Sequence, residues 1–182
     1  MDQVFAPWRI EWVEREDAVD DGDASACPFC DLPERQDDRE TRIVARSPRS
    51  FVLMNNYPYN PGHVMVIPRT HTGAYAGLEE AVLLDHARLK QRTLTALDEA
   101  MGVDGFNTGL NLGDAAGGSI DDHVHTHVVP RWGGDTNFMP VISDTKVIVQ
   151  AIEDTYDALY DAFADFDDAT VPGSDRAVEF EW

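Results

Sequence analysis

Residues 123–129 of this chain read HVHTHVV, so three histidines recur there with a period of two. In a β-strand that period places the three imidazoles on one face, successive rings about 6.6 Å apart along the strand. Val124, Thr126 and Val128 would face the other way, and all three are good strand formers. Half of the six histidines of the chain therefore share one short segment. This concentration predicts either a metal centre or a nucleophilic site for phosphate.

The hydrophobic pattern around this segment predicts an α+β fold with a mainly antiparallel five-stranded sheet and two main helices. Strands and helices alternate in groups rather than singly, which argues against a parallel nucleotide-binding sheet. The last five residues, VEFEW, alternate like a half-buried extended segment. The predicted strands are 42–46, 50–55, 63–67, 106–113 and 123–130, and the predicted helices are 77–101 and 143–166.

We interpret residues 1–182 as a single domain, because 43% hydrophobic content is enough for one sizeable core. Within it, residues 1–40 would form an N-terminal extension that contains a Cys-x-x-Cys motif. Residues 41–142 would form the catalytic core, and residues 143–182 a C-terminal helix and tail.

The charge balance is strongly acidic, since 34 Asp and Glu residues face 14 Lys and Arg residues for a net charge of −20. Such a charge repels nucleic acid polymers and anionic membranes, so neither is an expected partner. It is typical of a halophilic protein, whose self-repulsion is screened by salt. No apolar run approaches the roughly 20 residues that span a bilayer, and the first residues lack the pattern of a signal peptide. We therefore expect a cytoplasmic protein.

The two cysteines, Cys27 and Cys30, form the motif CPFC. This spacing suits a metal chelate or a redox pair. The redox interpretation is weakened because the motif follows a polar, Asp-rich run rather than a strand. A structural zinc ion takes four Cys or His ligands, and His71 and His123 would complete such a set. The residues alone leave the choice among the histidines open, and two free buried cysteines are the simpler alternative.

His125 and His127 then remain for phosphate chemistry. A neutral imidazole is a competent nucleophile near neutral pH, because its ordinary pKa is about 6.5. The preceding loop, residues 114–122, contains Gly117 and Gly118, whose backbone N–H groups can approach an anion. Ser119 adds a hydroxyl donor. Together these residues favour a site that attacks and binds phosphate.

HVHTHVV resembles the His-φ-His-φ-His-φ-φ motif (φ, hydrophobic) of the histidine triad (HIT) superfamily of nucleotide hydrolases and transferases, with Thr126 in a φ position. Residues 53–71 resemble the ribose-side segment of that superfamily. Residues 105–138, and APWRIEW at residues 6–12, are similar to the branch that contains diadenosine tetraphosphate phosphorylases. The resemblance covers roughly residues 6–150 and implies a HIT-like fold.

The resemblance implies a role for each matching residue. His125 matches the nucleophile that attacks the α-phosphate and forms a nucleotidyl-histidine intermediate. His127 matches the histidine that binds phosphate and assists the leaving group, and Ser119 would help it. In uridylyltransferase relatives this third histidine is Gln, so His127 favours hydrolysis or phosphorolysis. Zinc would be held, as a structural ion, by Cys27, Cys30, His71 and His123.

The nucleotide-binding residues are implied in the same way. Asn55 matches a ribose-binding residue, and His63 matches a histidine near the triad. Asn111, Gly118 and Ser119 match phosphate contacts, while Trp132 matches an aromatic residue that shapes the substrate site. Many members carry Gly-Gln-Ser/Thr before the triad, and this chain lacks that Gln.

The resemblance also implies a homodimer. The alternation in VEFEW separately suggests that the last strands and this tail could cross to the partner and border its site. The expected substrate is a dinucleoside polyphosphate such as diadenosine tetraphosphate. Nucleoside phosphoramidates and aminoacyl adenylates present the same α-phosphate and are alternatives. Two further alternatives are a catalytic metal held by all three triad histidines and a regulatory nucleotide-binding module with little catalysis.

Overall fold

The computed structural model describes residues 27–35, 37–118, 120–135 and 152–182. Several sequence predictions lie outside these residues: the APWRIEW segment and most of the N-terminal extension, Ser119, and the first part of the predicted helix 143–166. In the described part of the chain, no helix is both long and apolar enough to cross a membrane.

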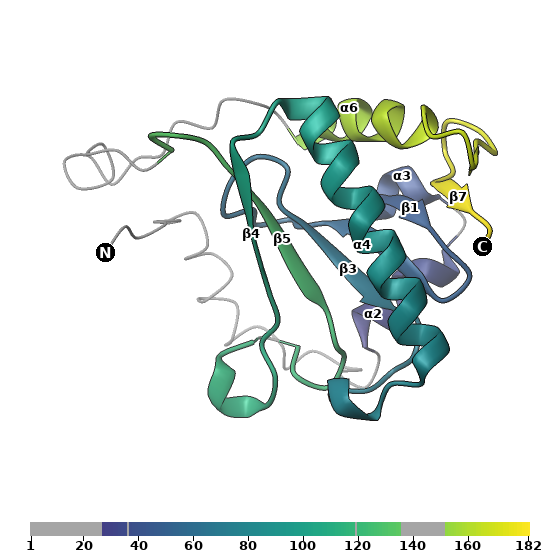
Figure 1. Ribbon diagram of the computed structural model, residues 1–182. Coiled ribbons are helices and arrows are strands. Elements are labelled where there is room, and N and C mark those ends of the chain that lie inside the picture. Colours follow the sequence, from purple (N-terminus) through teal and green to yellow (C-terminus); the bar gives the residue numbers. More distant parts are fainter. Residues whose placement is uncertain (1–26, 36, 119, 136–151) are drawn as a thin grey trace.

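One sheet runs through the molecule, with the strand order β4-β5-β3-β2-β1-β7-β6 (Figure 1). Neighbouring strands pair antiparallel except for β1 and β7, which are parallel. The α+β prediction with a mainly antiparallel sheet is therefore confirmed, although two short strands extend the predicted five. The strands are β1 (Ile43–Arg46), β2 (Ser50–Met54), β3 (Val64–Pro68), β4 (Gly105–Gly109), β5 (Thr126–Arg131), β6 (Ala169–Thr170) and β7 (Val178–Phe180).

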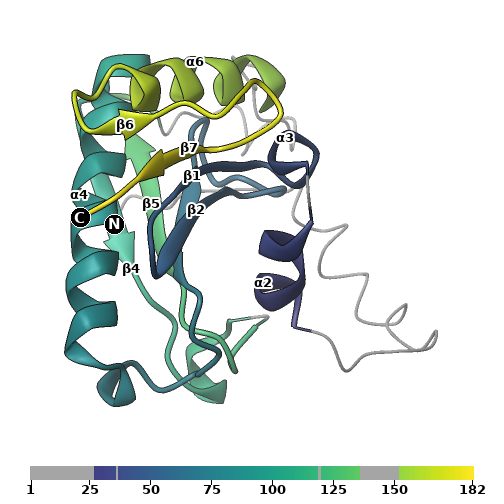
Figure 2. The same ribbon diagram turned by 90° about the vertical axis from the view of Figure 1, so that its right-hand side faces the viewer.

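Helices α4 (Glu80–Met101) and α6 (Ile152–Ala164) pack on one face of this sheet (Figures 1 and 2). The apolar stripe of α4 includes Val82, Leu89 and Leu97, which are buried. The helix ends at Gly102, which caps it with a φ of 57° and donates its N–H to the Asp98 carbonyl. A positive φ is easily adopted by glycine, so the chain can turn sharply into β4.

The opposite face of the sheet carries the short helix α2 (Pro28–Asp31) and the 3-10 turn η3 (Leu32–Glu34) (Figure 2). There Phe29 packs into a second hydrophobic cluster with side chains from β1, β2 and β3. The members of this cluster from the sheet are Ile43, Phe51, Leu53, Met65 and Ile67. Because α2 is only four residues long, this face is partly open, and the functional site lies on it.

Three predicted boundaries need correction. β5 begins at Thr126 rather than residue 123, because its pairing with β3 ends at Thr126 and the N–H of Val124 donates instead to the carbonyl of Thr72. β4 ends at Gly109 rather than residue 113, since its ladder with β5 stops there. Helix α4 begins at residue 80 rather than 77, after a 3-10 turn (η4, Tyr75–Gly77) and an extended Glu79.

The C-terminal segment alternates in burial as predicted, with Val178 and Phe180 buried and Glu179 half-buried. It does not leave the molecule, because β7 pairs with β1 of the same chain. Trp182 also donates its indole N–H to Asp85 in α4 at 3.0 Å. In this structure the tail therefore completes its own core, and the predicted crossing to a partner is corrected.

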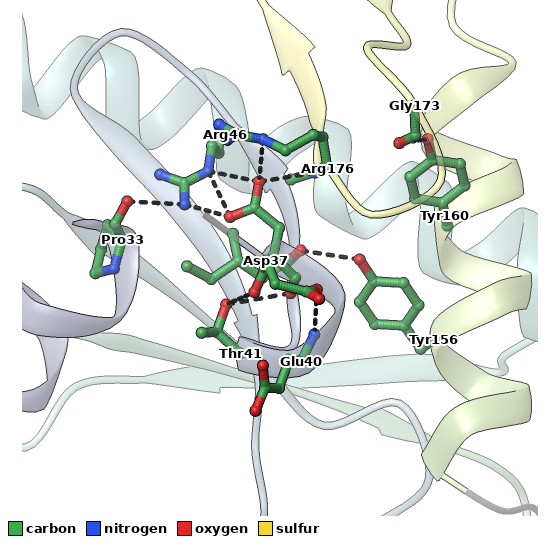
Figure 3. Close-up of polar contacts among 12 residues, drawn as sticks. Pro33, Asp37, Glu40, Thr41, Arg46, Tyr156, Tyr160, Gly173 and Arg176 are labelled. Atoms are coloured by element: carbon green, nitrogen blue, oxygen red, sulfur yellow. Dashed lines mark hydrogen bonds and ion pairs between the residues drawn. The ribbon is translucent and has the colours of Figure 1, made fainter. Parts of the chain in front are cut away.

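A buried carboxylate, Asp38, joins this tail to the body of the protein. Asp38 begins the one-turn helix α3 (Asp38–Thr41) and accepts hydrogen bonds from the guanidinium of Arg46 and the N–H of Ala177, the latter at 2.9 Å. Arg176 lies 3.3 Å from the same carboxylate. Figure 3 shows Arg46 and Arg176 converging here, with Arg46 also donating to the carbonyl of Pro33. The carboxylate of Asp38 thus connects α3, β1 and the C-terminal tail.

We expect Asp38→Ala to lower the free energy of unfolding by about 3–5 kcal/mol, because it leaves the buried Arg46 without its partner. Urea denaturation would measure this loss. Asp157→Ala is the matched control: Asp157 also pairs with an arginine, Arg39, but its side chain is 57% exposed, and its loss is expected to change stability by less than about 1 kcal/mol. Equal losses in the two variants would contradict the role assigned to Asp38.

Candidate active site and metal centre

The site is built on a row of side chains that crosses four strands. His127 in β5 lies opposite Met65 in β3, Met65 lies opposite Leu53 in β2, and Leu53 lies opposite Ile43 in β1. Directly paired residues share a face of a sheet, and three members of this row, His127, Met65 and Leu53, form the floor of the site. Two strand spacings of about 4.8 Å give this floor a length of roughly 10 Å.

A cavity of about 450 Å³ lies over this floor. Its volume is in the range usual for small-molecule sites. His125 and His127 line it, and their ring centroids are 4.9 Å apart. The other walls come from α2 and η3 and from the segments around Arg42, Tyr57 and Gly118. The cavity is therefore a groove lined by two imidazoles.

The tautomer of His125 is set by the backbone. Its Nδ1 lies 2.9 Å from the carbonyl oxygen of His123, which can only accept a hydrogen bond. The proton of the neutral imidazole therefore sits on Nδ1, and Nε2 carries the lone pair. A histidine held in this way has a nucleophilic nitrogen in a defined direction.

His127 is oriented by a second histidine. The backbone N–H of Tyr59 donates to Nδ1 of His63 at 3.1 Å, so neutral His63 carries its proton on Nε2. That Nε2 lies 2.9 Å from Nδ1 of His127, which must then accept. The proton of His127 is left on its own Nε2. The two histidines of the cavity thus differ: His125 offers a lone pair and His127 offers an N–H donor.

The other predicted nucleotide-binding residues are distributed as follows. Asn55, Asn111 and Gly118 line the cavity, and Asn55 is held by the N–H of Tyr57, which donates to its Oδ1 at 2.8 Å. A Cβ on Gly118 would lie 3.2 Å from the Cβ of Asn111, so glycine lets these two segments approach. Ser119 lies outside the described residues.

Trp132 is placed away from the groove. Its indole N–H donates to the carbonyl of Gly102 at 3.1 Å, beyond the end of α4, and it is not among the described residues that line the cavity. The indole packs there because the turn after β5 runs back toward the C-terminus of α4.

The sequence analysis did not single out several lining residues. Leu53 and Met65 could have been predicted from strand alternation. Both lie in predicted strands, with Met65 opposite His127 and Leu53 opposite Met65. No local pattern predicts the walls from α2, η3 and α3, because tertiary contacts place those short elements. The remaining lining residues not predicted include Phe29, Leu32, Arg35, Glu40, Arg42, Asn56 and Ile120.

Beside the cavity, Cys27, Cys30, His71 and His123 bring four ligand atoms within 4.8 Å of one another. Nδ1 of His123 lies 3.3 Å from Sγ of Cys27 and 3.6 Å from Sγ of Cys30, and Nδ1 of His71 lies 3.3 Å from Sγ of Cys30. Tetrahedral zinc with ordinary bond lengths separates such ligands by about 3.3–3.8 Å. The four residues therefore fit a zinc ion.

Hydrogen bonding and burial favour metal binding by the histidine ligands. Nε2 of His123 donates to the carbonyl of Pro68 at 2.7 Å, which leaves Nδ1 to face the sulfurs. Burial lowers the pKa of His123, which favours the neutral, metal-binding form. Gly73 then lets the His71 loop approach the triad, because a Cβ there would lie 2.3 Å from the carbonyl oxygen of Asp121.

The remaining histidines are engaged elsewhere. His86 is buried in α4, with Nε2 at 3.3 Å from the carbonyl oxygen of Val66 and 3.1 Å from Oγ1 of Thr126. Burial lowers its pKa. His63 contacts His127, as described above. Among the described residues, the metal-binding cluster therefore contains His71 and His123, which resolves the choice that the residues alone left open.

Comparisons with known proteins agree with this geometry. The HIT domain profile matches residues 36–134. The chain is 37% identical over 158 residues to an AP-4-A phosphorylase from Mycobacterium tuberculosis, covering 85% of this chain and 80% of that protein. This chain belongs to the HIT family.

Two further relatives bear on the site. A bis(5'-adenosyl)-triphosphatase from Dictyostelium discoideum is 31% identical over 93 residues, or 51% of this chain and 62% of that protein. The crystal structure of a Zn-bound histidine triad family protein from Mycobacterium smegmatis matches with a TM-score of 0.59 and 25% identity, covering 75% of this chain and 92% of that one.

We expect the purified protein to contain about one zinc ion per chain, held by two cysteines and two histidines. His125→Ala should retain this zinc, because His125 faces the cavity rather than the metal cluster. Cys30→Ser should lose it. Elemental analysis of the three proteins measures the result, and loss of zinc from His125→Ala would instead support a metal held by the triad.

Proposed function

We propose that this protein cleaves a dinucleoside polyphosphate at its α-phosphate through a nucleotidyl intermediate on His125. The observation that carries the proposal is the pairing of opposite tautomers in one cavity. His125 is held by the carbonyl of His123 with its Nε2 lone pair available, and His127 carries an N–H on Nε2. The similarity to proteins named AP-4-A phosphorylase and bis(5'-adenosyl)-triphosphatase supports this substrate class.

In the first step, the Nε2 lone pair of His125 attacks the α-phosphorus. A P–N bond forms, and the bond from phosphorus to the bridging oxygen of the leaving nucleotide breaks. The N–H of His127 donates a hydrogen bond to the leaving oxygen and stabilises the charge that develops there, so the leaving nucleotide departs as an anion. Such fixed donors account for most of the catalysis expected in phosphoryl transfer.

In the second step, water or inorganic phosphate attacks the same phosphorus and breaks the P–N bond. The electron pair of that bond returns to Nε2 of His125, and the surplus proton of the attacking group is released to solvent. Water yields a nucleoside monophosphate, and inorganic phosphate yields a nucleoside diphosphate. His127 and backbone groups near Gly118 are the donors that we assign to the phosphate, together with Ser119.

The nucleoside is assigned to the floor of the groove. With the α-phosphate at His125 and His127, the floor extends roughly 10 Å across Met65 to Leu53. This apolar floor suits a base, and Asn55 lies beside it to bind the ribose. A bound zinc ion would supply a structural cross-link beside the groove.

We expect diadenosine tetraphosphate to be consumed by the wild-type protein, and His125→Ala to lose at least about a thousandfold in rate, because its nucleophile is gone. Separation of products with and without added phosphate identifies the second nucleophile. ADP plus ATP indicates phosphorolysis, and AMP plus ATP indicates hydrolysis.

Circular dichroism and the zinc content of His125→Ala are the controls for its fold. Full turnover by a folded His125→Ala would contradict the proposed nucleophile. Binding of the substrate without turnover, and without a labelled nucleotidyl-enzyme after acid quenching, would favour a regulatory binding module. Preferential cleavage of a nucleoside phosphoramidate or an aminoacyl adenylate would change the substrate class and keep the mechanism.

We further propose that the protein is a homodimer, as its resemblance to the family implies. β4 ends the sheet, and its residues Asn107–Gly109 are exposed. An edge strand is normally covered or paired, which supports this edge as the contact. Light scattering in molar salt is expected to give about twice the mass of one chain, and a monomer would contradict the proposal.

A further inference from the structure

Phe29 lies between the two cysteines of the metal cluster in the sequence and contacts two histidines of the triad, His123 and His125. Its ring centroid is 5.1 Å from that of His125 and 5.6 Å from that of His123, the latter edge-on at 89°. The side chain is 5% exposed and lines the cavity beside His125. One short segment, CPFC, therefore contributes two metal ligands and one wall of the groove.

A second connection runs through His123. Its imidazole faces the cysteine sulfurs, while its backbone carbonyl accepts the hydrogen bond from Nδ1 of His125 at 2.9 Å. A single residue thus joins the metal cluster to the group that sets the tautomer of His125. Movement of His123 would displace that carbonyl as well.

The helix that carries Phe29 has little stability of its own. α2 has four residues, and among the described residues its N-cap, Cys27, makes no side-chain capping hydrogen bond. Helices this short are unstable without tertiary contacts. The metal cluster and the packing of Phe29 in the second hydrophobic cluster therefore hold α2 against the sheet.

We propose that Phe29 is a positioning residue through which the metal site controls the reaction, by holding the imidazole of His125 and closing the groove over the nucleotide. This inference rests on the proposed function of the groove. It assigns the metal a second role besides stabilising the fold. The metal would also control the affinity for the nucleotide and the position of the His125 imidazole. A displacement of about 1 Å in a reacting group can lower a rate by about a hundredfold.

Phe29→Leu tests the role of the ring, and Phe51→Leu is the matched control. Both residues belong to the same buried cluster, but Phe51 is not among the described residues that line the cavity. We expect both variants to retain zinc. Phe29→Leu should lower kcat about tenfold or more and weaken AMP binding, whereas Phe51→Leu should stay within about threefold of wild type. Phe29→Tyr, which keeps the ring, should preserve activity.

The coupling to the metal is tested by calorimetry of AMP binding, with and without zinc. Removing zinc from the wild-type protein should weaken AMP binding at least about fivefold, and removing it from Phe29→Leu should add little. Such non-additivity is the signature of two groups that act through one contact. Additive losses, or an equal response from Phe51→Leu, would overturn the inference.

The binding measurement separates this inference from the proposed function. If AMP binds and the cycle is non-additive while diadenosine tetraphosphate is not turned over, the coupling stands and the assigned reaction fails. If turnover depends on His125 but Phe29→Leu matches Phe51→Leu, the reaction stands and the coupling fails. Absence of AMP binding in the wild-type protein would overturn both.

Discussion

The hydrogen bond from Nδ1 of His125 to the carbonyl of His123 is the contact on which the rest of the site depends. It holds the imidazole in one direction, with Nδ1 as the donor, without help from a charged group. The same geometry requires that the chain leave the regular ladder just before β5, since His123 and His125 precede Thr126, the first residue of the strand. The irregular backbone here therefore has a function: it frees a carbonyl that a continued ladder would occupy.

Backbone contacts determine which ring nitrogen of each triad histidine carries its proton. The carbonyl of Pro68 turns His123 toward the cysteines, the carbonyl of His123 orients His125, and the N–H of Tyr59 orients His127 through His63. Each contact fixes a proton on one ring nitrogen, so the three histidines present different atoms: His123 turns Nδ1 to the cysteines, His125 offers a lone pair, and His127 offers an N–H donor. The cavity is also lined by Arg35 and Arg42, which supply positive charge in a chain whose net charge is −20.

Local sequence patterns predicted the elements whose residues are periodic, which are strands β1 to β5 and helices α4 and α6. They did not predict α2, α3 or β6, because these are two to four residues long and are placed by distant contacts such as that between Asp38 and Ala177. The residues alone left the metal ligands undecided for the same reason. His71 meets His123 only through the contact between Thr72 and Val124 and the close approach at Gly73, and neither leaves a local signal. The family resemblance identified the four residues, and the structure brings them together.

The carboxylate of Asp38 also bears on the order in which the chain can fold. Its hydrogen bond to Ala177 spans 139 residues, and β7, which follows at once, pairs in parallel with β1 near the other end of the described chain. Contacts between such distant segments form late and slowly, because the entropy cost of closing the long loop comes before the stabilisation from the contact. During synthesis, Asp38 can gain its contact with Ala177 only after that residue has been made. The edge of β1 that pairs with β7 stays uncovered until β7 has also been made.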